Sequence, residues 1–266
     1  MKRLIHAIRY YGVFWILLQL IEENLHIRLP LGSKFRWKLS VKTETKFWDK
    51  YLGSPNGEYG EEYRTRLDPN TKLDDEVAEL LPNQPSVSIL DVGAGPLTCL
   101  GKTWDHGKLN ITAVDPLADE YDKIIDRYRL KPVVRTRKLD AEKLSTLFPE
   151  ATFDLAFARN AIDHSYSPEE SVLQMLKVTK PGGHVLLVHS QNEAIKEKWK
   201  GLHQWNFSLE GGDFIISSKN GKVNFSRKYA SICSTSVYHD AANDWIHVTL
   251  HKNRPEPDPA SGMGSL

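Results

Sequence analysis

The residues with the clearest chemical potential lie between Asp91 and Gly95, in a segment that reads Asp-Val-Gly-Ala-Gly. Gly93 and Gly95 lack a Cβ atom, so the backbone can turn sharply here and a ligand can approach its peptide groups closely. Asp91 precedes the glycines, where a carboxylate attracts a cationic ligand and repels a phosphate. The segment therefore predicts a binding turn for a ligand with positively charged groups. A plain strand-to-helix turn with two glycines is the structural alternative.

A second carboxylate follows the next apolar run, because residues 110–114 are succeeded by Asp115 and Pro116. A carboxylate at the end of a second parallel strand can accept both hydroxyls of a ribose in a bidentate manner. Pro116 is also favourable in the first turn of a helix, so Asp115 can cap the helix that starts at Leu117. The two roles are compatible, and Asp115 is the predicted ribose ligand.

Two histidines are the predicted catalytic residues. His164 follows the fourth predicted strand, at the sheet edge where ligands bind in open α/β folds, and His203 lies further along the chain. An imidazole can take up a proton near physiological pH. The alternative role of His164 is to cap or bridge the loop before Pro168.

A further polar group consists of His189, Asn192, Glu193 and His203. Histidine and glutamate at such a spacing can recruit a divalent metal, but the chain has no helical His-Glu-x-x-His run. Helix capping and surface positions explain the same residues. No metal site is therefore predicted.

These residues depend on a repeating pattern of strands and helices for their positions. Val87 to Val92 is a short apolar run between Pro85 and Gly93, as in a buried parallel strand. Further strands are predicted over 110–114, 132–137, 153–158 and 185–188, and helices over 74–81, 97–105, 118–130 and 167–179. A helix over 192–200, a hairpin turning at 219–221 and strands over 232–238 and 245–252 complete the pattern.

Three stretches of this pattern resemble the class I S-adenosylmethionine-dependent methyltransferases. They are 91–95, the apolar strand 153–158 with its polar end, and 176–188, which reads Leu-Lys-Val-Thr-Lys-Pro-Gly-Gly-His-Val-Leu-Leu-Val. The dinucleotide-binding Rossmann fold is the competing match, but Pro96, Leu97 and Thr98 stand where its third glycine is required. The resemblance covers 86–190. It implies an α/β fold with a Rossmann-like seven-stranded sheet in the order 3-2-1-4-5-7-6, helices on both faces and an N-terminal helical appendage.

The resemblance also implies S-adenosylmethionine as the cofactor. The implied cofactor-binding residues are Asp91, Gly93, Gly95, Asp115, Pro116, Asp140, Ala141 and Asn160. Asp140 stands where the family places an acid or amide near the adenine, although it can also be a helix N-cap.

The predicted activity is O-methylation of a small-molecule, sugar or lipid-linked glycan acceptor. His164 and His203 offer neutral bases for a hydroxyl acceptor. No Asn-Pro-Pro-Tyr or Asp-Pro-Pro-Tyr sequence follows the fourth strand, which disfavours nucleobases and glutamine amides. The alternative is a catalytically silent methyltransferase-like domain that binds a partner.

Charge and composition indicate where the protein works. The 266 residues carry a formal net charge of +1, so nothing favours nucleic acid as a partner. The two cysteines, Cys99 and Cys233, are too few for a disulfide framework, and we expect a cytoplasmic protein. The first fifty residues, however, contain ten Lys or Arg against four acidic residues.

This basic segment includes an apolar, aromatic-rich stretch over 10–21 that is too short to span a bilayer. We expect peripheral membrane contact through residues 1–40 on the inner face of the membrane, with docking on the domain or on a second subunit as the alternative. The oligomeric state stays open. The predicted organisation is an amphipathic helix and lid over 1–82, a methyltransferase domain over 83–253 and a flexible tail over 254–266.

Overall fold

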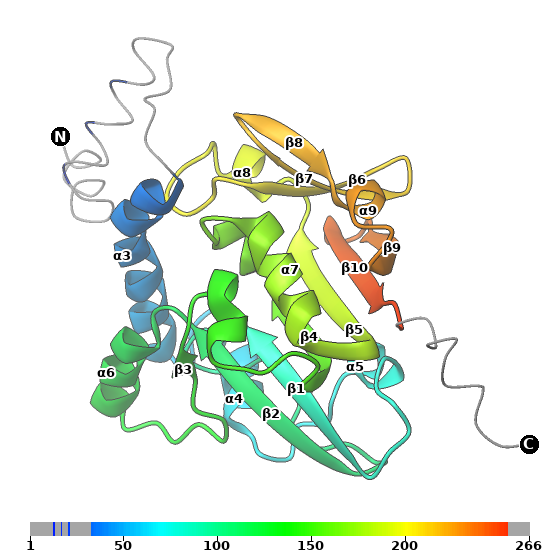
Figure 1. Ribbon diagram of the computed structural model, residues 1–266. Helices are drawn as coiled ribbons and strands as arrows, with labels where there is room; N and C mark the ends of the chain where they lie inside the picture. Colours follow the sequence, from blue (N-terminus) through cyan, green and yellow to red (C-terminus); the bar gives the residue numbers. More distant parts are fainter. Residues whose placement is uncertain (1–12, 14–16, 18–20, 22–32, 255–266) are drawn as a thin grey trace, which may run out of the picture.

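The computed structural model describes residues 33–254, together with Val13, Leu17 and Ile21. The other residues of the predicted N-terminal helix, and the predicted tail from residue 255 onward, lie outside the described residues. Figure 1 shows the described part as one large sheet with helices packed around it and a smaller sheet at one end.

Seven strands form the large sheet, in the order β3-β2-β1-β4-β5-β10-β9. Their bounds are β1 Ser86–Val92, β2 Lys108–Asp115, β3 Arg137–Lys138, β4 Phe153–Arg159, β5 Thr179–Ser190, β9 Cys233–Asp240 and β10 Trp245–Lys252. Strands β1 to β5 pair in parallel, whereas β10 pairs antiparallel with both β5 and β9. Since β9 and β10 are the sixth and seventh strands of this sheet along the chain, the predicted order is confirmed.

Alternate residues of the central strands face two different hydrophobic clusters. Leu90 and Val92 of β1 pack into one cluster with α7 Pro168–Val178, whereas Ile89 packs into another with α5 Asp75–Glu79. The same alternation continues in β4 and β5. The sheet is therefore covered on both faces, as continuous apolar runs in parallel strands predict.

The remaining helices and a small second sheet surround this core. The helices are α3 Ser33–Leu52, α4 Gly60–Leu67, α6 Ala118–Tyr128, α8 Glu193–Lys196, α9 Phe225–Lys228 and the 3₁₀ helices η1 Ala141–Thr146 and η2 Ile162–His164. The second sheet contains β6 Asn206–Glu210, β7 Asp213–Ser218 and β8 Gly221–Asn224, all antiparallel. Strands β7 and β8 are joined by a tight turn, so the predicted hairpin is confirmed. Phe207 and Phe214 join this sheet to the cluster under α7.

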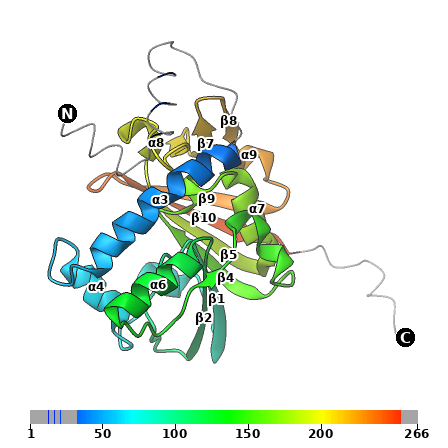
Figure 2. The same ribbon diagram turned by 90° about the vertical axis from the view of Figure 1, so that its left-hand side faces the viewer.

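Helix α3 packs on the α/β domain although it precedes the first strand by more than thirty residues. Trp48, Tyr51 and Leu52 are buried with Tyr121 and Ile125 of α6. Burial of each large apolar side chain contributes roughly 1.5–3 kcal/mol, so hydrophobic contact holds this end of α3 in place. Figure 2 shows α3 running in front of the sheet, with α4 and α6 near one end of it.

The predicted helix over 97–105 is wrong, because this stretch is a loop without helical turns. Its backbone pairs with the segment before β1: the N–H of Lys102 donates to the carbonyl of Thr71 at 2.7 Å. Such bonds use backbone groups that a helix would pair internally. Leu97 and Leu100 are both buried in the loop.

Two other predicted elements are much shorter in the structure. The strand predicted over 132–137 is reduced to β3 at the sheet edge. In this stretch Arg135 forms an exposed ion pair with Asp122 of α6 at 2.9 Å. The helix predicted over 192–200 is limited to α8, because Lys198 adopts a left-handed φ of 54° that ends regular helix.

We expect Gly101→Ala to lower the free energy of unfolding by about 1–3 kcal/mol, the usual cost of overpacking. An added Cβ would lie 2.2 Å from the carbonyl of Lys72, in the segment against which the loop packs. Chemical denaturation measures the change. The matched control is Gly57→Ala, whose Cβ would approach Ser54 to 3.1 Å in an exposed turn. Equal stability of the two variants would contradict the observed pairing.

Candidate active site

All eight predicted cofactor residues line one cavity at the carboxyl edge of the large sheet. They are Asp91, Gly93, Gly95, Asp115, Pro116, Asp140, Ala141 and Asn160. The cavity has a volume of about 850 Å³, including the part open to solvent. Residues from four different loops thus meet in one place, and their roles as ligands stay predictions.

Asp115 connects two of these loops from the end of β2. One carboxylate oxygen accepts an N–H bond from Gly95 at 3.2 Å, and the other accepts one from Leu117 at 2.8 Å. Burial raises the pKa of Asp115 to about 7, although the two backbone bonds oppose the shift. Asp115 therefore fixes the N-cap residue of α6, Leu117, but does not itself cap the helix, and its side chain still lines the cavity.

Asp91 is buried at the end of β1 and anchors the loop that follows. The hydroxyl of Thr98 donates to its carboxylate at 2.6 Å, and the N–H of Leu100 donates to the same hydroxyl at 3.1 Å. Burial raises the pKa of Asp91 to about 6. The carboxylate of Asp91 thus fixes the start of this loop through Thr98.

The two glycines leave space that no other residue would leave. Gly93 and Gly95 have φ of 74° and 63°, in the left-handed region. A Cβ on Gly93 would lie 2.4 Å from the Cβ of Ala161, and one on Gly95 would lie 2.7 Å from the ring of Trp48. Trp48 belongs to α3, so this helix forms a wall of the cavity.

The opposite end of the cavity is closed by Tyr166. Its hydroxyl donates to Asp140 at 3.1 Å, and its ring meets the edge of Trp37 from α3 with centroids 6.0 Å apart. The carboxylate of Glu142 accepts backbone N–H bonds from Tyr166 and Ser167. Asp140 occupies the N-cap position of η1, as its alternative role predicted, but its side chain makes no capping hydrogen bond.

Carboxylates outnumber guanidinium groups around the cavity. The acidic lining residues are Glu44, Asp91, Asp115, Asp140 and Glu142, and the basic ones are Arg66 and Arg159. Such a lining suits a sulfonium cation with an amino group and repels a pyrophosphate. Residues 96–107 form a loop, so no helix N-terminus follows β1 to bind a phosphate. The residues present therefore fit S-adenosylmethionine.

The two predicted catalytic histidines meet, although 38 residues separate them in the chain. The Nε2 atom of His164 lies 3.1 Å from the Nδ1 atom of His203, so one ring donates and the other accepts. Burial opposes protonation of His164, but Asp163 and other nearby carboxylates outweigh it and raise the pKa. Burial and the neighbouring His164 lower the pKa of His203 to about 3.

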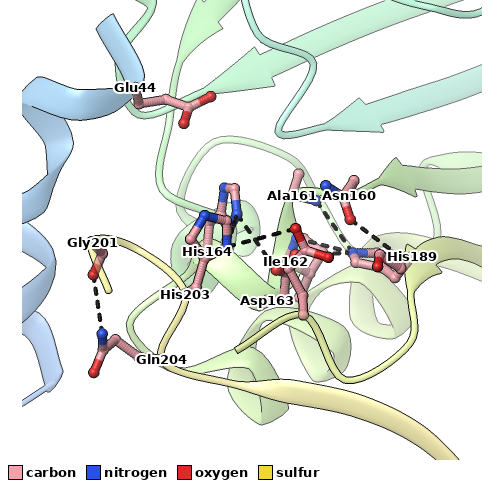
Figure 3. A network of polar contacts seen from close by, with 12 residues as sticks. Glu44, Asn160, Ala161, Ile162, Asp163, His164, His189, Gly201, His203 and Gln204 are labelled. Carbon is pink, nitrogen blue, oxygen red and sulfur yellow. Dashed lines mark hydrogen bonds and ion pairs between the residues drawn. The ribbon is translucent and has the colours of Figure 1, made fainter. Parts of the chain in front are cut away.

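Asp163 and His189 complete this network, which Figure 3 shows from close by. The Nε2 atom of His189 accepts backbone N–H bonds from Ala161 and Ile162 at 3.3 and 3.1 Å, so His189 fixes the loop before His164. Burial lowers its pKa to about 4, consistent with a neutral ring. Asp163 is buried beside it, with a carboxylate oxygen 3.5 Å from His164 Nε2.

A second cavity adjoins the first, with a volume of about 1,390 Å³ that includes open solvent. Both cavities are lined by Glu44, Trp48, Arg66, Arg159, Asn160, His164 and Leu202, and the second alone by Phe47, Tyr51, Tyr59, His203 and Trp245 among others. Aromatic faces with polar groups between them suit a sugar or an aromatic ring. His164 therefore stands where the two cavities meet.

The sequence did not single out three residues that the structure places at the site. Trp48 and Glu44 come from α3, and the only signal for them was the aromatic content of the segment that precedes the first strand. Asp163 is directly adjacent to His164, and an acid beside a candidate base was a signal that could have been used. Of the other predicted polar group, Glu193 lies 3.9 Å from His203.

We expect Asp115→Asn to flatten the pH dependence of stability. Because the pKa of Asp115 rises to about 7 in the folded protein, the parent's free energy of unfolding should fall as pH rises from about 4 to 7. At about 1.4 kcal/mol per unit, this residue should account for up to about 4 kcal/mol of that loss. Urea denaturation at several pH values measures the slope. Asp91→Asn should remove a smaller share, and a parental slope in both variants would contradict the prediction.

Residues 90–187 match a family model described as a methyltransferase domain. Over 105 residues the chain is 31% identical to a phosphatidylethanolamine N-methyltransferase of Cereibacter sphaeroides, a match that covers 38% of this chain and 49% of that protein. Over 133 residues it is 23% identical to the 27-O-demethylrifamycin SV methyltransferase of Amycolatopsis mediterranei, covering 50% of this chain and 49% of the relative. The chain thus spans about half the length of these two curated relatives.

Among solved structures, a SAM-dependent methyltransferase from Aquifex aeolicus is 14% identical, with a TM-score of 0.43 over 76% of this chain and 97% of the other. The segment matched by the family model contains the Asp91–Gly95 turn and the loops after β2, β3 and β4. These are the loops that build the cavity. The sequence match and the strand order thus support a class I S-adenosylmethionine-dependent methyltransferase domain around residues 90–187, with S-adenosylmethionine as the cofactor.

Proposed function

We propose that the protein methylates an oxygen atom of a small-molecule, sugar or lipid-linked glycan acceptor that binds in the second cavity. His164 carries this proposal, because it lines both cavities and contacts His203. Methyl transfer to a hydroxyl requires the hydroxyl proton to leave, and a polar cluster at the meeting point of cofactor and acceptor can promote that loss.

The residues of the protein align the two reactants, the cofactor and the acceptor. S-adenosylmethionine, when bound, supplies an electrophilic methyl group on a sulfonium sulfur. The eight predicted cofactor residues in the first cavity would hold S-adenosylmethionine. Asp115 would bind the ribose, and Asp140 would lie at the adenine end. Trp48 and Leu202 line both cavities and present apolar surface between them. Such positioning can supply much of the rate enhancement of a two-reactant transfer.

One of the two curated relatives is named as an N-methyltransferase and the other as a methyltransferase of an O-demethylated compound, so their names do not decide the acceptor atom. The loop after β4 reads Asn-Ala-Ile-Asp-His and lacks the Asn-Pro-Pro-Tyr type of sequence, which favours oxygen as the acceptor atom.

A catalytically silent domain that binds a partner is the alternative function. The buried carboxylates and the open glycine turn support cofactor binding. Calorimetry with S-adenosylmethionine, S-adenosylhomocysteine and NAD tests whether the protein binds the cofactor.

We expect His164→Ala to lower the turnover number by about 100-fold or more while S-adenosylmethionine binds with unchanged affinity, because general acid–base groups typically contribute 10²–10⁴-fold. Labelled S-adenosylmethionine with a library of hydroxylated metabolites and glycans measures turnover, and calorimetry measures binding. His247→Ala is the matched control, since His247 pairs with Glu76 on the surface at 2.6 Å. Full turnover in His164→Ala would remove His164 from the reaction.

We also propose that the N-terminal segment attaches the protein to the cytoplasmic face of a membrane. None of the helices that the structure describes has the length and hydropathy needed to cross a bilayer. Val13, Leu17 and Ile21 are helical, four residues apart and exposed, which gives this segment an apolar stripe. Each nearby Lys or Arg contributes about 1 kcal/mol at an anionic surface.

We expect the full chain to co-sediment with anionic vesicles at low salt, and to be largely released at high salt because surface charges are then screened. Neutral vesicles of the same size are the control and should retain much less protein. Sedimentation assays at two salt concentrations measure both. Absence from every pellet would reject membrane attachment and leave docking on protein as the role of the segment.

A further inference from the structure

The buried carboxylate of Asp163 is unusual among the charged groups that the structure describes. Both of its oxygens are buried without a hydrogen-bond partner among the described residues. A buried charge without partners costs several kcal/mol, and such groups in proteins are normally paired or bind a metal. Two imidazole nitrogens lie close to this carboxylate: His164 Nε2 at 3.5 Å and His189 Nε2 at 3.8 Å.

Neither His189 nor His164 by itself compensates the negative charge of Asp163. His189 Nε2 already accepts two backbone N–H bonds, so it presents a lone pair and not a proton toward Asp163. His164 Nε2 faces His203 Nδ1, and a single shared proton there satisfies that pair alone. An oxygen of Asp163, Nε2 of His164 and Nδ1 of His203 are therefore potential ligand atoms that lie close together.

We propose that Asp163, His164 and His203 bind a divalent transition-metal ion of the Zn²⁺ class. One oxygen and two nitrogens from these residues all lie within 4.8 Å of one another. Bonds of about 2.0–2.1 Å in a tetrahedron place ligand atoms about 3.4 Å apart. Two of the observed separations, 3.1 Å between the imidazoles and 3.5 Å between Asp163 and His164, are close to that value. The third, between Asp163 and His203, is within 4.8 Å, so a small side-chain movement would complete the tetrahedral set on metal binding.

The donor set decides which metals are expected. Two imidazole nitrogens and one carboxylate suit Zn²⁺ and related first-row ions, as in catalytic zinc sites with three protein ligands and one open position. Mg²⁺ and Ca²⁺ prefer oxygen ligands throughout. Glu193, with an oxygen 3.9 Å from His203, adds negative charge beside the site.

The site deepens the proposed function and rests on it, because His164 and His203 line the second cavity. An acceptor hydroxyl that occupies the open position would lose its proton to solvent more easily, since a bound metal lowers the pKa of an oxygen ligand. An oxygen lone pair then forms the bond to the methyl carbon while the carbon–sulfur bond breaks and leaves its electron pair on sulfur. The products are a methyl ether, a neutral thioether and the released proton.

The test uses the full chain, stripped of metal with a chelator that is then removed. Calorimetric titration with Zn²⁺ should show one site per chain, Co²⁺ should produce visible absorption typical of a tetrahedral ion, and Mg²⁺ should not compete. His203→Ala should weaken Zn²⁺ binding by at least about 100-fold, since even outer-shell changes cost roughly 10–100-fold. His239→Ala is the matched control, because His239 pairs with Asp244 on the surface at 3.0 Å and should leave binding unchanged.

Asp163→Asn provides a second variant of nearly equal volume, with circular dichroism to establish that it folds. Weakened Zn²⁺ binding in a folded Asp163→Asn protein would support the site. Absence of stoichiometric binding to the parent, or parental affinity in His203→Ala, would overturn it. Titration of the same metal-free parent with S-adenosylmethionine separates the two proposals: a parent that binds cofactor but no Zn²⁺ overturns only the metal site, whereas failure to bind cofactor overturns the proposed function.

Discussion

The carboxylate of Asp115 is the group around which the cofactor cavity is assembled. Its two oxygens accept backbone N–H bonds from Gly95, after β1, and from Leu117, before α6. A buried carboxylate is costly unless such bonds compensate it, so the charge and the two loops stabilise one another. The hydroxyl of Thr136 also donates to the carbonyl of Gly95 at 2.7 Å. The glycine turn, the start of α6 and the loop before β3 therefore keep a fixed relation at one edge of the sheet.

Helix α3 completes the site from outside the sheet. Its buried aromatic residues pack on α6, and the same packing places Trp48 against Gly95 and Trp37 against Tyr166. The first and second cavities share Trp48 and Glu44 as lining residues. Any movement of α3, including one transmitted from the N-terminal segment, would therefore change both cavities together. This gives a physical route by which attachment of the N-terminus to a surface would influence the site.

The loop after β1 separates this protein from phosphate-binding relatives of the same general architecture. A helix that begins after the first strand offers backbone N–H groups and a positive dipole end to an anion. Here the loop instead pairs with the segment around Thr71, and its first turn is held by Asp91 through Thr98. The cavity is consequently rich in carboxylates, which suits a cationic sulfonium ligand.

The sequence alone predicted the burial of the central strands and a binding turn at the glycines after the first strand, because apolar runs and glycine positions are local properties. The strand order and the set of cavity-lining residues followed from the resemblance to the methyltransferases, which local motifs carry. The predicted helix over 97–105 was wrong, because the backbone of this loop pairs with Thr71 instead. Only the tertiary structure brought His164 to His203 and α3 to Gly95. Contacts between segments that are 38 or more residues apart in the sequence depend on the tertiary fold, and no local sequence pattern specifies them. For the same reason the unpartnered carboxylate of Asp163 could be recognised only after its neighbours were known.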